Sequence, residues 1–382
     1  MLYSLRLSSE AISSINFRYV LNSFFFDNVF MQSFEKLSRR GQLLRLRSLA
    51  QTALRQYSLA PYQMSVLQHE HNTTFRVQTA DDQSFVLRIH RPGQHTVEAI
   101  NSELLWLAAL NEETELKIPQ PVLAKNGALF TIVATEGVPK PRACVLFRWL
   151  PGRFLYHNLK PTHLEHVGVF MAYLHRHASN WQFPPNFLRG RVDVLTSEAR
   201  HISNLNPGQG TFADWVNYPT QDDVDGCLRL VSELCTPEDL ASVTRAIHQT
   251  RLVLDELGYS PEMFGLIHAD LHQENYLFHR GQVGAIDFDD CGFGHYLYDL
   301  SVTLIEISGF QGYATLRNAL LTGYRRVRPL PVDQESYLTS FFRLRCLQLL
   351  VWVLESREHP AFRNRWKRWA KEELDNLRQW VK

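Results

Sequence analysis

The sequence predicts an α+β protein of two lobes, with an antiparallel sheet and a helix in the N-terminal lobe and mainly helices in the C-terminal lobe. Three observations support this. The chain has 382 residues, more than one average domain. Strand-like segments gather between residues 66 and 149, and apolar residues at helical spacing dominate after residue 160. We expect an N-terminal extension and helix over residues 1–58, a nucleotide-binding lobe over 59–150 and a helical lobe over 151–382.

The composition is that of a globular protein without a strong charge preference. Forty basic residues oppose 39 acidic ones, and 45% of the residues are hydrophobic. We therefore expect neither a nucleic acid nor a membrane surface as a partner. No apolar run approaches the roughly 18–20 residues of a membrane helix. Five scattered cysteines without metal-like spacing indicate reduced thiols, and we expect a cytoplasmic monomer or homodimer.

The N-terminal lobe carries a cation and a carboxylate in a suggestive order. A helix is expected over residues 41–57, and a glycine-free loop containing Asn72 and Thr73 separates two strands. Arg88 lies in the strand 84–89, and Glu103 lies on a helix that Thr96 caps. A strand cation followed by a helix carboxylate positions nucleotide phosphates in kinases. An ordinary hairpin and a surface arginine are the alternatives.

Further strands lead to the predicted lobe boundary. Asn126-Gly127 predicts a tight hairpin between residues 122–125 and 128–133. The strand 143–149 ends at Leu150-Pro151-Gly152, where we place the boundary between the lobes. The backbone near Phe147 and Trp149 is then a candidate to bind the edge of an adenine ring.

The second half alternates helical and irregular segments. A helix is expected to end near His175, and residues 177–235 are predicted to be irregular. Thr236-Pro237 predicts the start of another helix, which Gly258 closes. The tail 336–382 is predicted to form packing helices. His175 and His177 are expected to pack or lie at the surface, because no zinc-like spacing surrounds them.

The stretch from Leu266 to Leu300 carries the chemistry. Asn275 follows Asp270 by five residues, and Asp287 follows an apolar pair after a short turn. Phosphoryl transfer needs a carboxylate that orients the acceptor hydroxyl and oxygen ligands that hold metal ions. Asp270 fits the first role, while Asn275 and Asp287 fit the second. Asp289 is an additional ligand or a partner of one.

Two other residues of this stretch have candidate supporting roles. His268 is expected to pack inward and hold the turn through hydrogen bonds, with a role as catalytic general base as the alternative. Asp299 follows Tyr298 at the start of an apolar helix. It is expected either to cap that helix or to accept hydrogen bonds from the catalytic loop.

These motifs resemble the aminoglycoside/choline phosphotransferase family. HADLHQEN is similar to the HGDLHxxN loop of that family, IDFDD to its metal motif and EHNTTFRV to its nucleotide loop, over roughly residues 60 to 310. The resemblance implies a protein-kinase-like fold, ATP and Mg²⁺, with Asp270 as the base and Asn275 and Asp287 as metal ligands. Arg88 stands where the family has a lysine, which affects the geometry at the nucleotide phosphates.

The acceptor is open at the level of sequence. The segment from LRIHRPG to SELLWLAAL resembles type II homoserine kinases and the bacterial stress-response Ser/Thr kinase. The resemblance implies a small hydroxyl acceptor, such as homoserine, an amino alcohol or an aminoglycoside. A Ser/Thr protein kinase and a nucleotide-binding module without catalysis are the alternatives. Asp222, Asp223 and Asp225 form either an acidic acceptor pocket or a solvated loop.

Overall fold

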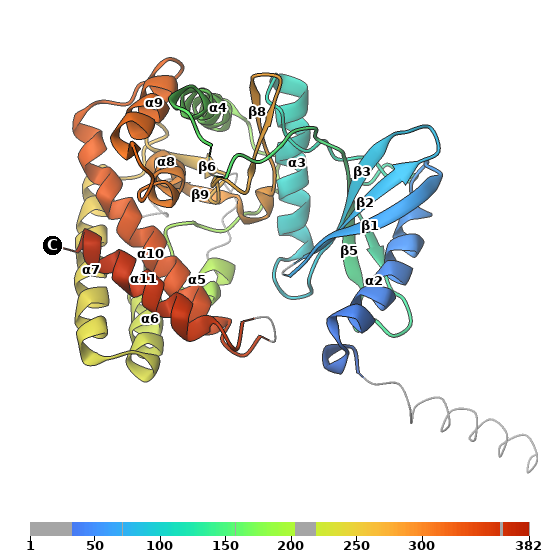
Figure 1. The fold of residues 1–382 in the computed structure, drawn as a ribbon, viewed down its shortest axis with the longest axis horizontal. Helices are drawn as coiled ribbons and strands as arrows, with labels where there is room; N and C mark the ends of the chain where they lie inside the picture. Colours follow the sequence, from blue (N-terminus) through green and yellow to red (C-terminus); the bar gives the residue numbers. More distant parts are fainter. Residues whose placement is uncertain (1–32, 71, 157, 203–218, 360–361, 382) are drawn as a thin grey trace, which may run out of the picture.

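The chain folds into two lobes that lie side by side (Figure 1). The computed structural model describes residues 33–70, 72–156, 158–202, 219–359 and 362–381. Most of the predicted extension, residues 1–32, therefore lies outside the described residues. The sheet lobe contains α2 and β1–β5, and the larger lobe is mainly helical, with α3 between the two. The predicted α+β class is confirmed.

One five-stranded antiparallel sheet forms the smaller lobe. Its strands, in spatial order, are β1 (Pro61–His69), β2 (Thr73–Thr79), β3 (Ser84–Ile89), β5 (Arg142–Arg148) and β4 (Thr131–Val133). Arg88 on β3 lies opposite Thr74 on one neighbouring strand and Val145 on the other. It is thus placed in the middle of the sheet. The two neighbouring strands therefore fix the backbone position from which the Arg88 side chain extends.

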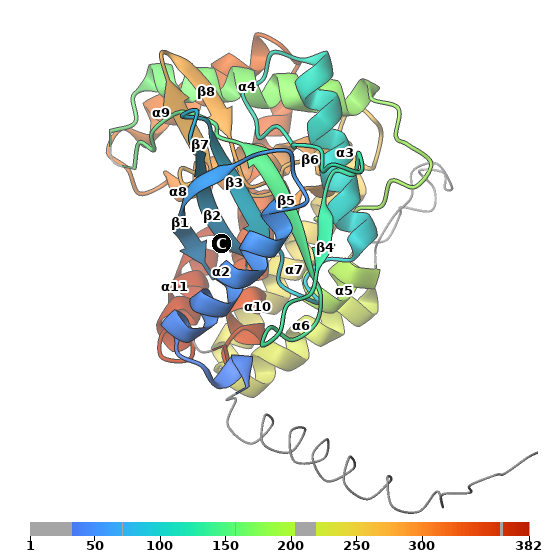
Figure 2. The ribbon, with the colours of Figure 1, turned by 90° about the vertical axis from the view of Figure 1, so that its right-hand side faces the viewer.

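Two helices cover the two faces of this sheet. α2 (Arg39–Leu54) packs on one face (Figure 2), where Leu49 and Ala50 join a cluster with Phe75 and Leu87. α2 ends at Leu54, three residues before the predicted end, and it packs on the sheet as part of that lobe.

α3 (Val97–Glu113) connects the lobes. Thr96 caps it by accepting a hydrogen bond from the Ala99 amide at 3.2 Å, as predicted. Its apolar side chains, Trp106 among them, pack into the core of the helical lobe. Trp106 meets the ring of Phe288 edge-on at 5.6 Å between centroids. α3 therefore holds Glu103 in a fixed position next to the metal motif.

The helical lobe is built around two short antiparallel ladders. These are β6 (Phe264–Ile267) with β9 (Gly292–His295) and β7 (Tyr276–His279) with β8 (Gln282–Ala285). The surrounding helices are α4 (Pro161–Asn180), α5 (Ser197–Ile202), α6 (Gln221–Leu234), α7 (Pro237–Leu257), α8 (Tyr296–Glu306), α9 (Tyr313–Arg325), α10 (Leu338–Glu355) and α11 (Trp366–Trp380).

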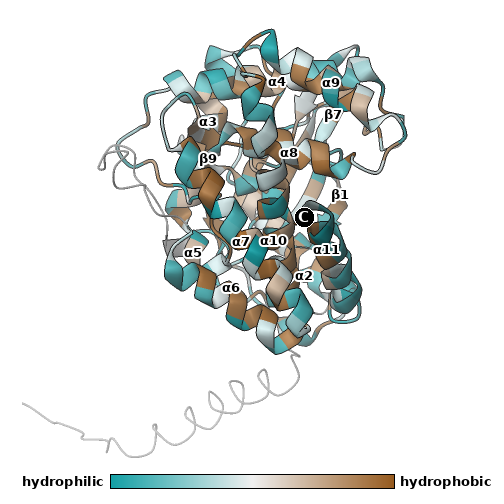
Figure 3. Cartoon of the chain, turned by 90° about the vertical axis from the view of Figure 1, so that its left-hand side faces the viewer, coloured by the Kyte–Doolittle hydropathy of each residue, from teal (hydrophilic) through white to brown (hydrophobic). Residues whose placement is uncertain are grey.

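α10 is the core helix of this lobe and α11 is a surface helix. α11 is hydrophilic over most of the face seen in Figure 3, with only Ala370, Leu374 and Leu377 buried. Among the described residues one helical segment, Asp333–Glu355, is long and apolar enough to cross a membrane, and two thirds of its apolar window is buried inside the protein.

Three sequence predictions about local structure differ from the fold. Asn126-Gly127 forms a turn that the Ala124 amide closes by donating to the Ala128 carbonyl at 2.9 Å, but no ladder of paired strands follows it, and the Val122 amide donates to the Leu146 carbonyl of β5 at 2.8 Å. Residues 177–235 also contain regular structure, since Thr220 caps α6 and Val224, Cys227 and Val231 give it a buried stripe. Further, α4 runs to Asn180, five residues past the predicted end at His175.

Candidate functional site

A hairpin brings the two candidate metal ligands together. Tyr276 pairs with Ala285 across the β7–β8 ladder, and the Ile286 amide donates to the Asn275 carbonyl at 3.0 Å. Asn275 immediately precedes this ladder and Asp287 follows it by two residues. The eleven residues between them in the sequence therefore fold back, and the two side chains leave the same end of the hairpin.

Asp299 holds the backbone of the loop that is predicted to be catalytic. Its carboxylate accepts hydrogen bonds from the amides of His268 at 2.9 Å and Ala269 at 2.7 Å. Ala269 has a left-handed backbone (φ +71°), which costs a residue with a Cβ roughly 1 kcal/mol or more. The two hydrogen bonds offset that cost. The expectation that Asp299 supports this loop is confirmed.

His268 supports the loop from within. Its ring is fully buried, with Nε2 3.0 Å from the Ile286 carbonyl and Nδ1 accepting from the Asp270 amide at 3.2 Å. Burial lowers its pKa, so the ring is neutral. Both nitrogens are engaged with the backbone. This geometry fits the inward supporting role predicted for His268, and it does not fit the alternative role as a general base.

Asp270 lies at the cleft between three polar neighbours. The Asn275 amide nitrogen contacts its carbonyl at 2.8 Å and its Oδ2 at 3.2 Å. Arg345 donates to Oδ1 at 2.5 Å, and His272 Nε2 lies 3.3 Å from Oδ2. Burial opposes ionisation, but the Arg345 guanidinium and His272 hold the pKa of Asp270 well below its usual range. The carboxylate is therefore ionised at every physiological pH.

Asp287 presents a carboxylate to the space between the lobes. It is half exposed, has a left-handed backbone (φ +65°) and lies 3.8 Å from Arg88 Nη1. Its removal from bulk water and the neighbouring Asp289 carboxylate raise its pKa to about 7. Crowded carboxylates of this kind bind hard cations. Because Asn275 uses Nδ2 for its hydrogen bonds, its Oδ1 is the atom suited to the same cation.

Arg88 forms the cationic centre of the nucleotide side. Nη2 lies 2.7 and 2.6 Å from the two Glu103 oxygens, and the guanidinium lies 5.0 Å from the centre of the Phe147 ring. Arg88 is buried, yet Glu103 and Asp289 keep its pKa above the ordinary value. The two residues thus lie together as the sequence predicts, and Arg88 also reaches the carboxylates of the metal motif.

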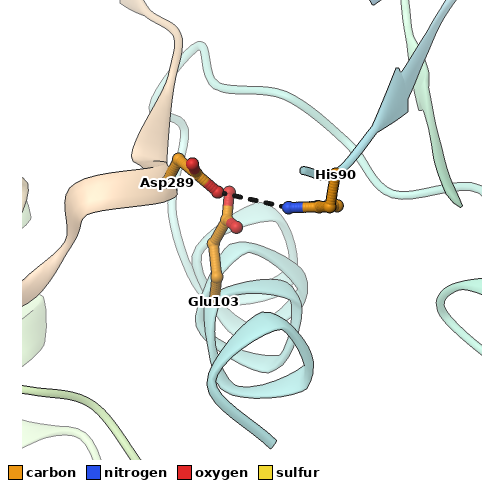
Figure 4. Close-up of side chains that lie close together, drawn as sticks. All are labelled: His90, Glu103 and Asp289. Atoms are coloured by element: carbon orange, nitrogen blue, oxygen red, sulfur yellow. Dashed lines mark ion pairs between the residues drawn. The ribbon is translucent and has the colours of Figure 1, made fainter. Parts of the chain in front are cut away.

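Asp289 points toward the sheet lobe. Its oxygens lie 3.5 Å from His90 Nδ1 and 3.3 Å from His95 Nε2, and Asn72 donates to Oδ2 at 2.8 Å. Figure 4 shows His90 and Asp289 facing each other over Glu103. The Arg88 guanidinium lies 3.9 Å from Asp289.

The surroundings of Asp289 are compatible with both of its predicted roles. His90, Glu103 and Asp289 are close enough to hold a metal ion. Arg88 also supplies positive charge to Glu103 and Asp289. Whether Asp289 is an additional metal ligand or a partner of one therefore stays a prediction.

Part of the backbone predicted to bind an adenine edge is already used. The amides of Arg148 and Trp149 donate to the carbonyls of Gln120 at 2.9 Å and Ser84 at 3.0 Å. These two amides are not available to an adenine, and a contact through the other backbone groups near Phe147 and Trp149 stays a prediction. The Trp149 ring stacks with Arg76 at 4.5 Å, and the Thr73 hydroxyl lies 2.8 Å from His69 Nδ1. The sequence could not show these partners, because each contact depends on how the strands pair.

The acidic triplet is not an acceptor pocket. Asp223 is buried and accepts hydrogen bonds from the amides of Leu195 at 2.7 Å and Thr196 at 2.8 Å. Asp222 and Asp225 are exposed in the first turns of α6. Negative side chains there stabilise a helix N-terminus. The three residues therefore have a structural role.

The sequence and the fold match known proteins. Residues 65–330 match the phosphotransferase enzyme family. A homoserine kinase of Neisseria meningitidis is 28% identical over 259 residues, 65% of this chain and 70% of that protein. A microcompartment-associated aminopropanol kinase has a TM-score of 0.68 and 28% identity, covering 88% of this chain and 95% of that one. An amicoumacin kinase in complex with AMP-PNP, Ca²⁺ and Ami also has a TM-score of 0.68, with 18% identity, covering 88% of this chain and 96% of that one.

Proposed function

The chain belongs to the phosphotransferase enzyme family, and we propose that it transfers the γ-phosphate of ATP, with Mg²⁺, to a hydroxyl group of a small metabolite. The observation that carries this proposal is the hairpin that places Asn275 beside Asp287 while Asn275 also contacts Asp270. The homoserine and aminopropanol kinases support an acceptor of the short amino-alcohol or hydroxy amino acid kind. The likeness to these kinases also supports a cytoplasmic location for this enzyme.

The reaction divides between the two lobes. Asp270 accepts a hydrogen bond from the acceptor hydroxyl and orients its oxygen toward the γ-phosphorus. The bond between that oxygen and phosphorus forms, the bond to the β-phosphate oxygen breaks, and the proton of the hydroxyl passes to Asp270 as ADP leaves. Because the transition state is loose, a carboxylate of low pKa suffices, since orientation matters more than basicity.

Asn275 and Asp287 are suited to hold the metal. Mg²⁺ bound by them would neutralise charge on the phosphates. Arg88, fixed by Glu103, directs its second edge toward the same region and is suited to hold a phosphate oxygen. As a planar fork it would bind that oxygen in a different geometry from a lysine.

The test is ATP turnover by the purified full chain against a panel of amino alcohols, hydroxy amino acids and sugars. We expect Mg²⁺-dependent ADP release that stops with EDTA and returns with Mg²⁺. Asp270→Ala should lower kcat by about 10²–10⁴-fold, the usual contribution of a positioned proton acceptor. Asp255→Ala, at an exposed position of α7, is the matched control. Unchanged turnover in Asp270→Ala would contradict the proposal.

A further inference from the structure

Two basic side chains contact Asp270 on its acceptor side, and two further carboxylates lie near them. Glu306 acts electrostatically on His272, and Glu373 acts on Arg345. Arg345 of α10 donates to one carboxylate oxygen at 2.5 Å, and His272 lies 3.3 Å from the other. The side chains of Arg345, His272 and Asp270 are 13%, 21% and 22% exposed. All three therefore reach the surface of the cleft. Within the described residues, the acidic triplet expected for a cationic acceptor lies elsewhere, at the start of α6.

Arg345 has more hydrogen-bond donors than its protein partners use. A guanidinium offers five N–H groups in a planar fork. Nη2 contacts Asp270, Nη1 makes a long contact of 3.5 Å to the Tyr298 hydroxyl, and Nε is buried without a partner among the described residues. A buried donor without an acceptor is unfavourable. An anionic oxygen arriving from the cleft would provide that acceptor.

The Arg345 guanidinium disfavours a cationic group placed directly against it. An ammonium group close to the reacting hydroxyl would have to approach the Arg345 guanidinium within the cleft, where charges are poorly screened. A carboxylate in that position would instead be attracted, and Arg345 could bind it while still contacting Asp270. Arginine is suited to this because its fork recognises carboxylates through two parallel hydrogen bonds.

We propose that the acceptor carries a carboxylate near its hydroxyl and that Arg345 is the specificity-determining residue that binds it. This rests on the proposed phosphotransfer to a small hydroxyl compound. It separates the two acceptor types of the relatives, because homoserine carries a carboxylate and aminopropanol does not. Arg345 is then a positioning residue for Asp270 and a binding residue for the substrate.

The test compares two acceptors that differ only in this group. Homoserine and the amino diol formed when its carboxylate is reduced would be assayed with Mg²⁺ and ATP, using wild type, Arg345→Met and Arg345→Lys. In wild type we expect kcat/KM to favour homoserine. Arg345→Met should raise the KM of homoserine by about 10- to 100-fold, as expected for losing a charge-assisted hydrogen-bonded pair. The KM of the diol should change less than about three-fold, and Arg345→Lys should restore part of the homoserine affinity.

Arg343→Met is the control on the same helix. Arg343 binds the Trp380 carbonyl at 2.7 Å and the Ser340 hydroxyl at 2.9 Å, away from Asp270, so both acceptors should behave as in wild type. Equal loss on both acceptors in Arg345→Met, or a wild-type preference for the diol, would overturn the proposal and show that Arg345 only orients Asp270.

A second measurement separates this inference from the proposed function. If no acceptor is phosphorylated, the proposed function fails, and the carboxylate site is tested by calorimetric binding of homoserine and of the diol without nucleotide. Tighter binding of homoserine that is lost in Arg345→Met supports the site. Equal or absent binding of the two compounds overturns it.

Discussion

Each side of the cleft contains an arginine paired with a carboxylate, but Arg88 is buried and Arg345 is partly exposed. On the nucleotide side, Arg88 faces three carboxylates: Glu103 at 2.6 Å, Asp287 at 3.8 Å and Asp289 at 3.9 Å. On the acceptor side, Arg345 binds Asp270, which His272 also contacts. The nucleotide side gathers three carboxylates around one arginine. On the acceptor side Arg345 and His272 contact one carboxylate directly, and Glu306 and Glu373 add negative charge near them.

This difference explains what each side can bind. An excess of carboxylates is unfavourable by itself, and it is relieved when a divalent cation arrives with the phosphates. The acceptor side needs no cation, because Asp270 is already compensated. We therefore propose that the metal binds on the Asp287 side of the cleft and that Arg345 receives a neutral or anionic group of the acceptor on the other side.

The comparison is tested most strongly by removing one charge from the nucleotide side. Asp287→Asn keeps the shape of the side chain and removes a metal ligand. We expect kcat/KM to fall by about 10³-fold, in the range of lost charge stabilisation in transfer reactions. Excess Mn²⁺ should restore only part of the rate. Asp290→Asn, whose partner is Arg200 at 3.1 Å, is the control, and an equal loss there would contradict the assignment of Asp287.

The next effect concerns Arg88. Arg88→Met leaves Glu103 buried without its partner, so the free energy of unfolding should fall by about 3 kcal/mol and ATP affinity should fall with it. Chemical denaturation and ATP kinetics measure the two effects. Arg88→Lys should retain more of the stability and more of the ATP affinity than Arg88→Met, because lysine keeps the positive charge.

A double variant separates stability from function at this pair. Arg88→Met combined with Glu103→Leu removes both buried charges, and it should recover most of the stability without recovering ATP affinity. Recovery of affinity as well would mean that Arg88 acts only through the fold.

The sequence predicted which candidate residues lie together where their geometry is local. Asp270 and Asn275 share one loop, and a four-residue turn returns the chain to Asp287. Arg88 and Glu103 lie 15 positions apart on a strand and the next helix. Spacing and secondary structure alone bring such residues together.

The sequence missed the partners that depend on tertiary packing. Arg345 meets Asp270 from 75 positions away, and Asn72 meets Asp289 from 217 positions away. No periodicity encodes which face of α10 turns to the cleft or how closely the lobes approach. The predicted hairpin at Asn126-Gly127 failed for the same reason, since the backbone before it pairs with β5.

The excess of carboxylates also predicts a pH dependence. The folded-state pKa of Asp287 is raised to about 7, so below pH 7 a proton competes with the metal. Apparent Mg²⁺ affinity should fall about ten-fold per pH unit from pH 7 to pH 5 and stay level from pH 7.5 to 9. Mg²⁺ titrations of initial rate at fixed ATP measure this. A constant affinity across the range would contradict the raised pKa.

The same raised pKa acts on the stability of the metal-free protein. Protonated Asp287 is favoured in the folded state, so its contribution is fully present below about pH 4 and is lost as pH rises through 7. Asp287→Asn should therefore stabilise the metal-free protein at pH 8 by about 1 kcal/mol, a value reduced because half of the side chain is exposed. Chemical denaturation at pH 5 and pH 8 tests this, and a gain at pH 5 equal to that at pH 8 would refute it.

The smallest expected effect lies at the contact between the nucleotide loop and the metal motif. Asn72 donates to Asp289 at 2.8 Å, and its side-chain oxygen accepts from the Arg91 amide at 3.2 Å. These two hydrogen bonds hold the Asn72 side chain in place on the nucleotide side of the cleft. Asn72→Ala should raise the KM for ATP by about three- to ten-fold, the range of one or two lost hydrogen bonds, and leave the KM of the acceptor unchanged. Asn72→Asp places a second carboxylate against Asp289 and should raise the KM for ATP further. Among the described residues, Asn72 contacts only groups on the nucleotide side. A change in the KM of the acceptor instead would therefore show that the two sides of the cleft are not independent.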